Sequence, residues 1–304
     1  TARTGTEVHQ NIIKKKVLLR GFSSNNLKEY ARNFFRDEKC CVLILNQLEA
    51  NPNLCSLCSV PLFCWIIFKC FEHFHSTFDS HELPSYTVTL TDIFLLMSEV
   101  HLNRTLKTDL LKKNTRSQVE TFRTQKETLF SLGKIAHMGM EKSLFIFDQE
   151  EVTSLNMSEQ DLHLGFLRTV YDYGGCGEQS SFEFFHLTLQ SFFTALFLVT
   201  EEKASTKELL KFFAECSSSE TSPTTCLPIR WLQNVSVGED PFRNKEHFHF
   251  TNLFLCGLLS KSKQKLIRHL VSPRAMKRKR KALVTYLLAS MKSHMQNLLR
   301  ARIN

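Results

Sequence analysis

Three cysteines and one histidine stand at a spacing that zinc-binding segments use. The pattern is C-x2-C-x11-C-x2-H, formed by Cys55, Cys58, Cys70 and His73. Thiolates and imidazoles are the usual ligands of a structural Zn²⁺, but the second pair could reach the first only if the chain between them looped back. That stretch contains the apolar run 60–68, which is typical of one continuous helix. We therefore predict that these side chains pack in a core and form no metal site.

A second candidate is His186, which follows the strand-like segment SSFEFF at 180–185 and opens a helix-like one. A helix N-terminus presents unpaired N–H groups and partial positive charge, so it is a natural place for a phosphate. A histidine there can add a charge-assisted hydrogen bond. Taken alone, however, a histidine in an apolar setting is more often a core residue whose hydrogen bonds are satisfied, and we favour that interpretation.

The motifs of an independent active site are missing from the sequence. There is no G-x-x-x-x-G-K-[ST] loop to hold a triphosphate, and there is no G-x-S-x-G nucleophile turn. The glycines at 174, 175 and 177 do not follow a strand into a helix with phosphate-loop spacing. No acidic strand end for Mg²⁺ and no Ser/His/Asp or Cys/His set stands out. We predict no catalytic residue and no enzyme activity for this chain.

Positive charge is concentrated in two runs. The formal charge is +9, and Lys14–Lys16 and the segment MKRKRK at 276–281 supply much of it. Such patches can bind nucleic acid, anionic lipid or an importin, whereas the simpler interpretation is a solvated helix face. We favour the solvated face. The alternative that stays open is a nucleic-acid-binding module that uses Lys277–Lys281.

Length and composition favour a helical protein of several compact units. The 304 residues exceed the length at which one hydrophobic core keeps growing. With 26 phenylalanines, 10 glycines and 7 prolines, long helices joined by a few loops are expected. The chain starts at Thr1 without a charged and apolar leader, and the run 60–68 is far shorter than the roughly 20 residues of a membrane helix. Cysteines inside apolar runs fit a reducing compartment, so we expect a cytoplasmic protein.

Hydrophobic periodicity predicts mostly helices in the first part of the chain. Residues 17–22 are the exception, because VLLRGF is typical of the last buried strand of an α/β domain. Asn51 and Pro52 should end a helix, since proline disfavours helical geometry at the preceding residue. Thr91 should cap the helix that follows the polar break 76–84. The predicted helices of this part cover residues 25–35, 42–48, 60–74, 91–100 and 122–140.

Short strands are predicted only in the second half. One is expected at 144–147, and Asp148 should begin a helix with acidic side chains at its positive end. GFLRTV at 165–170 and SSFEFF at 180–185 are typical of the two strands of a hairpin, and apolar residues at helical spacing follow. Helix, strand, helix, hairpin and helix in this order outline a winged-helix fold. Capping boxes are expected at 158–161 and 205–208 and a loop at 215–240. Helices are expected at 247–259, 263–270 and 274–299.

Several stretches resemble a known family. The segment FFHLTLQSFFTA at 184–195 resembles the F-x-H-x-x-[FL]-Q-E-F-F-A-A signature in the winged-helix domain of NACHT proteins, the NOD-like receptors. It departs from the signature at Ser191, where an acidic residue is common. ARTG at 2–5 is similar to the end of the family's sensor strand, and CSVPL at 58–62 resembles its G-x-P motif, with Ser59 in place of glycine.

The resemblance implies a nucleotide-dependent role for three residues. In that family the histidine of the signature binds the β-phosphate of ADP and holds the closed, inactive state. The arginine of the sensor strand senses the terminal phosphate, and the proline of the G-x-P motif packs against adenine. His186, Arg3 and Pro61 would be these residues here. The implied cofactor is ADP or ATP, with Mg²⁺ in the intact protein held by ligands outside this chain.

The resemblance also implies the fold class and the domain order. The chain would be mainly α and an interior segment of a larger protein. Residues 1–22 would be a short α/β remnant, the end of a NACHT nucleotide-binding domain. Residues 23–84 would form helical domain 1, residues 85–203 the winged-helix domain and residues 204–304 part of helical domain 2.

The implied function is that of a regulatory switch in a cytosolic innate immune receptor, whose intact form resembles a STAND-class ATPase. The expected partners are the upstream nucleotide-binding domain, the downstream leucine-rich repeats and further copies of the same protein. A kinase with a caspase-recruitment domain would bind through a domain outside this chain. The implied output is inflammatory NF-κB signalling in response to bacterial peptidoglycan fragments. Nucleic acid is not an expected partner; the protein could also be recruited to the plasma membrane by peripheral contact.

Overall fold

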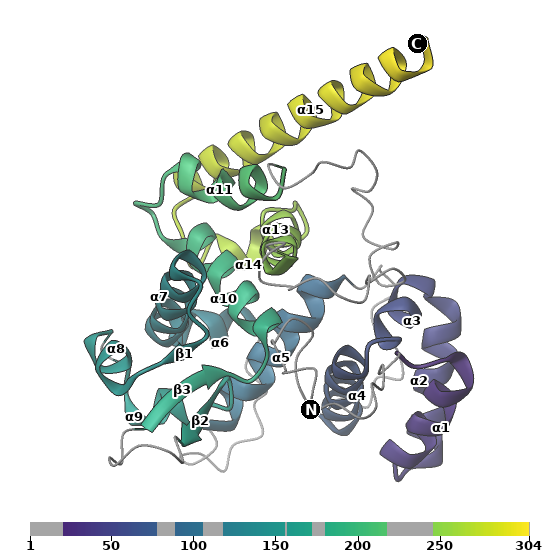
Figure 1. Ribbon diagram of the computed structural model, residues 1–304. Coiled ribbons are helices and arrows are strands. Elements are labelled where there is room, and N and C mark those ends of the chain that lie inside the picture. Colours follow the sequence, from purple (N-terminus) through teal and green to yellow (C-terminus); the bar gives the residue numbers. More distant parts are fainter. Residues whose placement is uncertain are drawn as a thin grey trace, which may run out of the picture. The chain divides into compact units, whose positions relative to one another are not determined.

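The computed structural model describes residues 21–77, 89–105, 118–155, 157–171, 180–217 and 246–303, and these are mainly helical, as predicted. They form two compact units, which divide between Gln125 and Lys126 (Figure 1). Each unit is described by itself. Residues 17–20 of the predicted strand 17–22 lie outside the described residues, as do residues 106–117 and 172–179 and most of the predicted loop 215–240.

The first unit consists of helices whose starts are set by short polar side chains. Ser23 accepts a hydrogen bond from the Asn26 N–H through its hydroxyl, and Asp37 accepts one from the Lys39 N–H. Asn51 ends one helix and caps the next, because its side-chain oxygen accepts from the Leu54 N–H. The helices are α1 (Ser24–Phe34), α2 (Glu38–Ala50), α3 (Pro52–Cys58), α4 (Pro61–Thr77), α5 (Leu90–Thr105) and α6 (Gln118–Thr124).

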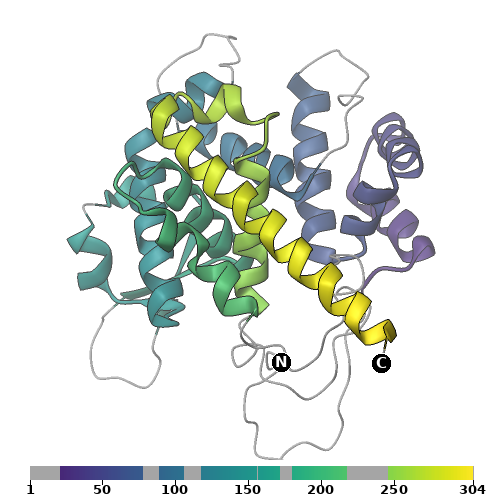
Figure 2. The ribbon, with the colours of Figure 1, turned by 90° about the horizontal axis from the view of Figure 1, so that it is seen from above.

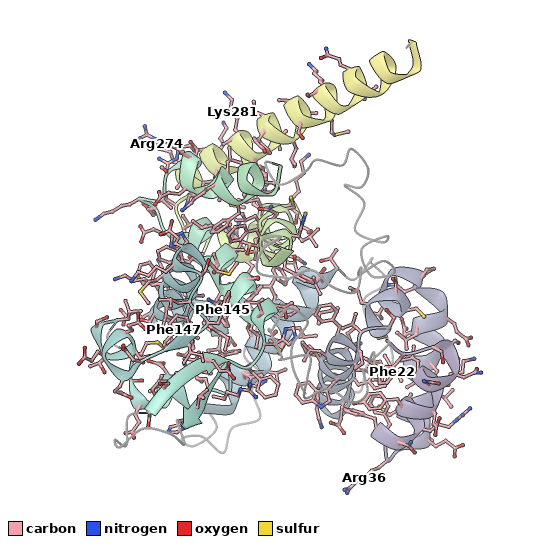
Figure 3. All side chains as sticks on the ribbon, viewed as in Figure 1. Phe22, Arg36, Phe145, Phe147, Arg274 and Lys281 are labelled. Carbon is pink, nitrogen blue, oxygen red and sulfur yellow. The ribbon has the colours of Figure 1, made fainter. Side chains whose placement is uncertain are left out.

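Helix α4 forms the centre of the first unit's aromatic core. Phe68 is fully buried, and its ring centroid lies 5.6 Å from that of Tyr30 and 5.0 Å from that of Phe35. Phe22 (labelled in Figure 3) extends this cluster, with its ring 5.0 Å from Tyr30. The prediction of one continuous, largely buried helix over the apolar run 60–68 is confirmed.

Two helix boundaries differ from the prediction. Helix α5 begins at Leu90, so Thr91 is a buried helical residue rather than the cap. Thr89 takes the capping place: Asp92 accepts its N–H at 2.9 Å and donates its own N–H to the Thr89 hydroxyl oxygen at 3.3 Å. The single helix predicted over 122–140 is broken at Gln125. There the Thr124 hydroxyl donates to two carbonyl oxygens of the preceding turn, a contact that disturbs helices.

The second unit combines a small sheet with helices packed on one another. Its strands are β1 (Ile146–Phe147), β2 (Leu167–Tyr171) and β3 (Ser180–Phe184), in the order β1-β3-β2 and antiparallel throughout. The predicted hairpin is confirmed, because Leu167 pairs with Phe184 and Arg168 with Glu183. The helices are α7 (Lys126–Lys142), α8 (Gln149–Ser154), α9 (Glu159–Leu162), α10 (Leu187–Thr200), α11 (Thr206–Ser217), α13 (Glu246–Leu258), α14 (Gln264–Ile267) and α15 (Pro273–Ile303).

The predicted helix caps of the second unit are present. Asp148 caps α8 in a full capping box with Glu151, which accepts the Asp148 N–H in return. Ser158 and Asp161 exchange the same pair of bonds at the start of α9. Ser205 and Glu208 do so before α11, so the two predicted capping boxes, at 158–161 and 205–208, are confirmed.

Helix α10 is the buried centre of this unit and lies between α7 and α13 (Figure 1). Phe193 packs edge-on against Phe166 of the segment that leads into β2, and Phe192 packs against Phe254 of α13. Gly133 lets α7 approach closely, because an added Cβ atom would lie 2.8 Å from the Cβ atom of Phe197.

The last helix, α15, runs across α11 (Figure 2) and makes ring contact with it, with Tyr286 5.6 Å from Phe213. Its later turns expose apolar side chains, among them Leu288, Met291 and Met295. Among the described helices, none combines the length and the apolar character that crossing a bilayer requires.

Candidate functional site

The site is centred on the junction between β3 and α10. The strand ends at Phe184, and the Phe185 N–H donates to the Phe166 carbonyl, which holds the last residue of the hairpin. His186 has extended backbone angles (φ −151°, ψ 148°) and is the N-cap of α10. The strand-to-helix junction expected here is therefore confirmed, and His186 is half-buried rather than part of the core.

The imidazole of His186 is oriented by its own helix. Nδ1 accepts the Thr188 N–H at 3.2 Å and lies 2.8 Å from the Thr188 hydroxyl oxygen. Because Nδ1 accepts this amide hydrogen, we assign the neutral tautomer that carries its proton on Nε2. The ring therefore has a fixed orientation and one N–H donor.

Two further N–H groups at the start of α10 are used internally. Leu189 and Gln190 donate their N–H groups to the His186 carbonyl, at 2.9 and 3.4 Å. The expectation of unpaired amides at this helix start is thus wrong for Thr188, Leu189 and Gln190. An anion at this position would meet the imidazole Nε2–H at the positive end of the helix, and a phosphate oxygen fits that donor.

Residues on the first turns of α10 fix the helix beneath the histidine. Gln190 is buried, and its Nε2 donates to the Leu144 carbonyl at 3.0 Å and to the Ala136 carbonyl at 3.5 Å. Gly139 makes room for this side chain, because an added Cβ atom would lie 2.5 Å from Gln190 Nε2. Ser191 is fully buried, with its hydroxyl donating to the Leu187 carbonyl. We did not predict the anchoring by Gln190, which no local pattern around it indicates.

Pro61 is exposed and occupies the first position of α4, where its fixed φ suits a helix start. The preceding Ser59 carbonyl accepts the Phe22 N–H at 2.7 Å. An added Cβ atom on Gly21 would lie 2.5 Å from that carbonyl oxygen, so glycine is needed there for the close approach. Ser59 itself has ordinary right-handed angles (φ −62°, ψ −26°), so serine fits where the family motif has glycine.

The three residues singled out by the family resemblance are not brought together by the described structure. Arg3 lies outside the described residues. Pro61 belongs to the first compact unit and His186 to the second. Their roles towards a nucleotide therefore stay predictions.

Comparison with known protein families identifies the second unit. A family model described as the NOD2 winged helix domain matches residues 127–184, and one described as the NLRC4 helical domain HD2 matches residues 186–303. The human nucleotide-binding oligomerization domain-containing protein 1 is 55% identical to the chain over 310 residues, which cover 100% of the chain and 32% of that protein. The chain belongs to the NOD-like receptor family.

More distant NOD-like receptors match as well. Nucleotide-binding oligomerization domain-containing protein 2 of Hylobates lar is 26% identical over 295 residues, covering 94% of the chain and 27% of that protein. The NACHT, LRR and PYD domains-containing protein 1 homolog of Danio rerio is 29% identical over 181 residues, covering 60% of the chain and 12% of that protein. The chain spans 32% or less of the length of these relatives.

The cysteine pattern of this NOD-like receptor chain is part of its helical packing. Cys58 and Cys70 are buried; Cys58 ends α3, whereas Cys70 lies within the continuous helix α4. A hydrogen bond with the neighbouring Cys64 and burial raise the pKa of the Cys58 thiol far above its ordinary value, so the thiol stays protonated. The side chain of His73 lies outside the described part, and the described side chains include no group of three or more His, Cys, Asp or Glu residues placed to hold a metal.

The basic run at the start of α15 is not simply a solvated face. Lys279 has no exposed surface, and its Nζ donates to the carbonyls of Leu198 at 2.7 Å, Val199 at 3.1 Å and Glu201 at 2.5 Å. These carbonyls lie at the C-terminal end of α10, which carries partial negative charge. The interpretation as a solvated face is therefore wrong for Lys279.

Two arginines beside it also bind carbonyls. Arg278 donates to the Glu202 carbonyl at 3.0 Å, and Arg280 donates to the Leu259 and Ser260 carbonyls at 2.7 and 2.9 Å. The solvated face holds for Lys277 and Lys281, which are exposed. Burial of Lys279 withdraws one of the five basic side chains at 277–281 from the surface that the nucleic-acid alternative would use.

Proposed function

We propose that this chain is the regulatory switch segment of an innate immune receptor, in which bound ADP holds a closed state and ATP permits assembly. The observation that carries the proposal is the capping geometry of His186. Its ring is held by the Thr188 N–H on Nδ1, which places the imidazole proton on Nε2 and lets the helix set the direction of that N–H. A donor fixed in this way can recognise a phosphate without reorganising the helix start.

The three residues would act on different parts of the nucleotide. His186 would donate from Nε2 to a β-phosphate oxygen, Pro61 would pack against adenine, and Arg3 would sense the terminal phosphate. Bound ADP would supply the charge that His186 recognises. Mg²⁺ would be held by residues outside this chain. We infer no hydrolytic role for the chain itself, although the intact protein would be a STAND-class ATPase switch.

The hydrogen bond from His186 is strong enough to bias such a switch. A hydrogen bond to a charged group contributes about 1.5–3 kcal/mol. Each 1.4 kcal/mol changes an equilibrium constant by about tenfold, so losing this bond would shift the balance of closed and open states by about tenfold or more. That is within the range of coupling energies in allosteric proteins.

The wider proposal concerns the intact receptor. Residues 1–22, 23–84, 85–203 and 204–304 would be the end of the nucleotide-binding domain, helical domain 1, the winged helix and helical domain 2. The receptor would be cytoplasmic, with peripheral recruitment to the plasma membrane. Release of the closed state by leucine-rich repeats that sense peptidoglycan fragments would allow self-assembly. Recruitment of a caspase-recruitment-domain kinase would then activate NF-κB.

The test is the basal output of the full-length protein in cells, read with an NF-κB reporter. His186→Ala should raise signalling in the absence of any ligand, because the closed state loses its phosphate contact. His163→Ala, at an exposed histidine of the same unit, should leave the basal signal unchanged. A His186→Ala protein with wild-type basal signalling at equal expression would refute the proposed role.

A further inference from the structure

Lys279 is a buried cation that no carboxylate of the described residues neutralises by a direct ion pair. Its ammonium instead donates to the Leu198 and Val199 carbonyls of the last turn of α10 and to the Glu201 carbonyl, which also accepts the Ala204 N–H at 3.2 Å. A side chain about 80 residues away along the chain therefore completes the end of this helix. Burial of a charge is costly unless it is well hydrogen-bonded, so the arrangement links the end of α10 to the position of α15.

The same helix carries His186 at its other end. Helix α10 has 14 residues, which correspond to a rod of about 21 Å at 1.5 Å per residue. Eleven of these residues are buried, so a shift of α10 requires the helices packed against it, α7 and α13, to move as well. Its N-terminus is capped by the candidate phosphate contact and its C-terminus by Lys279.

Further hydrogen bonds hold the first turns of α15 against the ends of neighbouring helices. Arg278 holds the turn after α10 through the Glu202 carbonyl, and the Glu202 carboxylate accepts the Ser272 N–H at 3.0 Å. Arg280 holds the end of α13 through the Leu259 carbonyl. The basic segment, which lies between the labelled Arg274 and Lys281 in Figure 3, thus meets the ends of two helices.

We propose that Lys279 is a positioning residue for His186: with Arg278 and Arg280 it forms a latch that holds α15 on the C-terminal end of α10. The latch keeps α10, and with it the imidazole, in the place required for the phosphate contact. This inference rests on the proposed role of His186. In the intact receptor, the latch couples the packing of α15 against α10 to the retention of ADP, and by thermodynamic linkage each then favours the other.

The chemistry of the latch suits a contact that must be released. When α15 leaves, water can hydrate both the ammonium and the carbonyls, so the net strength of such buried ionic contacts is modest. When α15 stays and the amine is removed, the buried Leu198 and Val199 carbonyls lose the donor that Lys279 supplied, which is costly. The latch is therefore specific without being permanent.

The experiment follows the release of ADP from the purified full-length protein by chromatography after dilution. Lys279→Met should release ADP about tenfold faster than the wild type, at a temperature where circular dichroism shows both to be folded. Lys279→Arg keeps a cation and should restore slow release. Lys277→Met, at an exposed lysine of the same helix, is the matched control and should behave as wild type.

A double variant separates positioning from general destabilisation. If Lys279 acts through His186, adding Lys279→Met to His186→Ala should accelerate release no further; additive effects would overturn the latch. Fast release from His186→Ala with wild-type release from Lys279→Met would overturn the latch alone. Wild-type release from His186→Ala would overturn the proposed function and the latch with it. Should Lys279→Met fail to fold, Arg278→Met decides by the same criteria.

Discussion

Replacement of Gly139 by alanine tests the packing that supports the candidate site. An added Cβ atom at this position would lie 2.5 Å from Gln190 Nε2, 2.6 Å from Phe147 Cζ and 2.7 Å from the Leu144 carbonyl oxygen. Contacts below 3 Å cannot be kept, so the Gln190 amide or the turn after α7 must move. The Gln190 hydrogen bond to that same carbonyl would then be lost.

The size of the effect follows from three contributions. Overpacking costs about 1–3 kcal/mol, and the loss of a buried hydrogen bond costs about 1–2 kcal/mol. Alanine returns about 1 kcal/mol through its higher helix propensity. We expect Gly139→Ala to lower the free energy of unfolding by about 2–3 kcal/mol.

The assay is urea unfolding of the purified protein, with Lys134→Ala as the control. Lys134 is an exposed residue of the same helix, and its replacement should change stability by no more than about 0.5 kcal/mol. A Gly139→Ala protein with the wild-type urea midpoint and slope would show that α7 and α10 do not approach each other as described.

Two further predictions concern a cap and a titration. Asp148→Ala removes the capping box of α8 and should cost about 1 kcal/mol in urea unfolding, whereas Glu150→Ala, within the same helix, should cost less; equal costs would contradict the cap. Burial, and after it the charge of Arg278, lowers the pKa of Lys279 to about 8, although the carboxylates of Glu201, Glu202 and Glu208 oppose this shift. Between about pH 8 and the ordinary lysine pKa of 10.5, the unfolded chain therefore binds more protons than the folded chain. The free energy of unfolding of the wild type, relative to that of Lys279→Met, should then rise with pH across this window. A difference that falls or stays flat would contradict the burial of the cation.

Features that depend on neighbouring residues were predictable from the sequence. The capping boxes at Asp148, Ser158 and Ser205 rest on side chains three residues apart, and all three are present. The same rule, applied strictly, would have selected Thr89 rather than Thr91, because Asp92 follows Thr89 by three residues. The error arose from reading the threonine beside the aspartate as the cap.

Features that depend on distant residues were not predictable in the same way. The carbonyls bound by Lys279 and Gln190 lie about 80 and 50 residues away along the chain, so no local pattern reveals them. One signal was available: Met276, Lys279 and Leu283 share one helix face, and the two apolar members are buried. A lysine at an apolar position of a helix indicates a buried, hydrogen-bonded cation.

The central claim is that His186 contacts the phosphate of bound ADP. The most direct test is the nucleotide content of the full-length protein after purification, measured by chromatography for wild type, His186→Ala and His163→Ala. The account predicts ADP near one per chain in the wild type and in His163→Ala, and a clear loss in His186→Ala at equal folded fraction. Equal ADP content in all three proteins would contradict it.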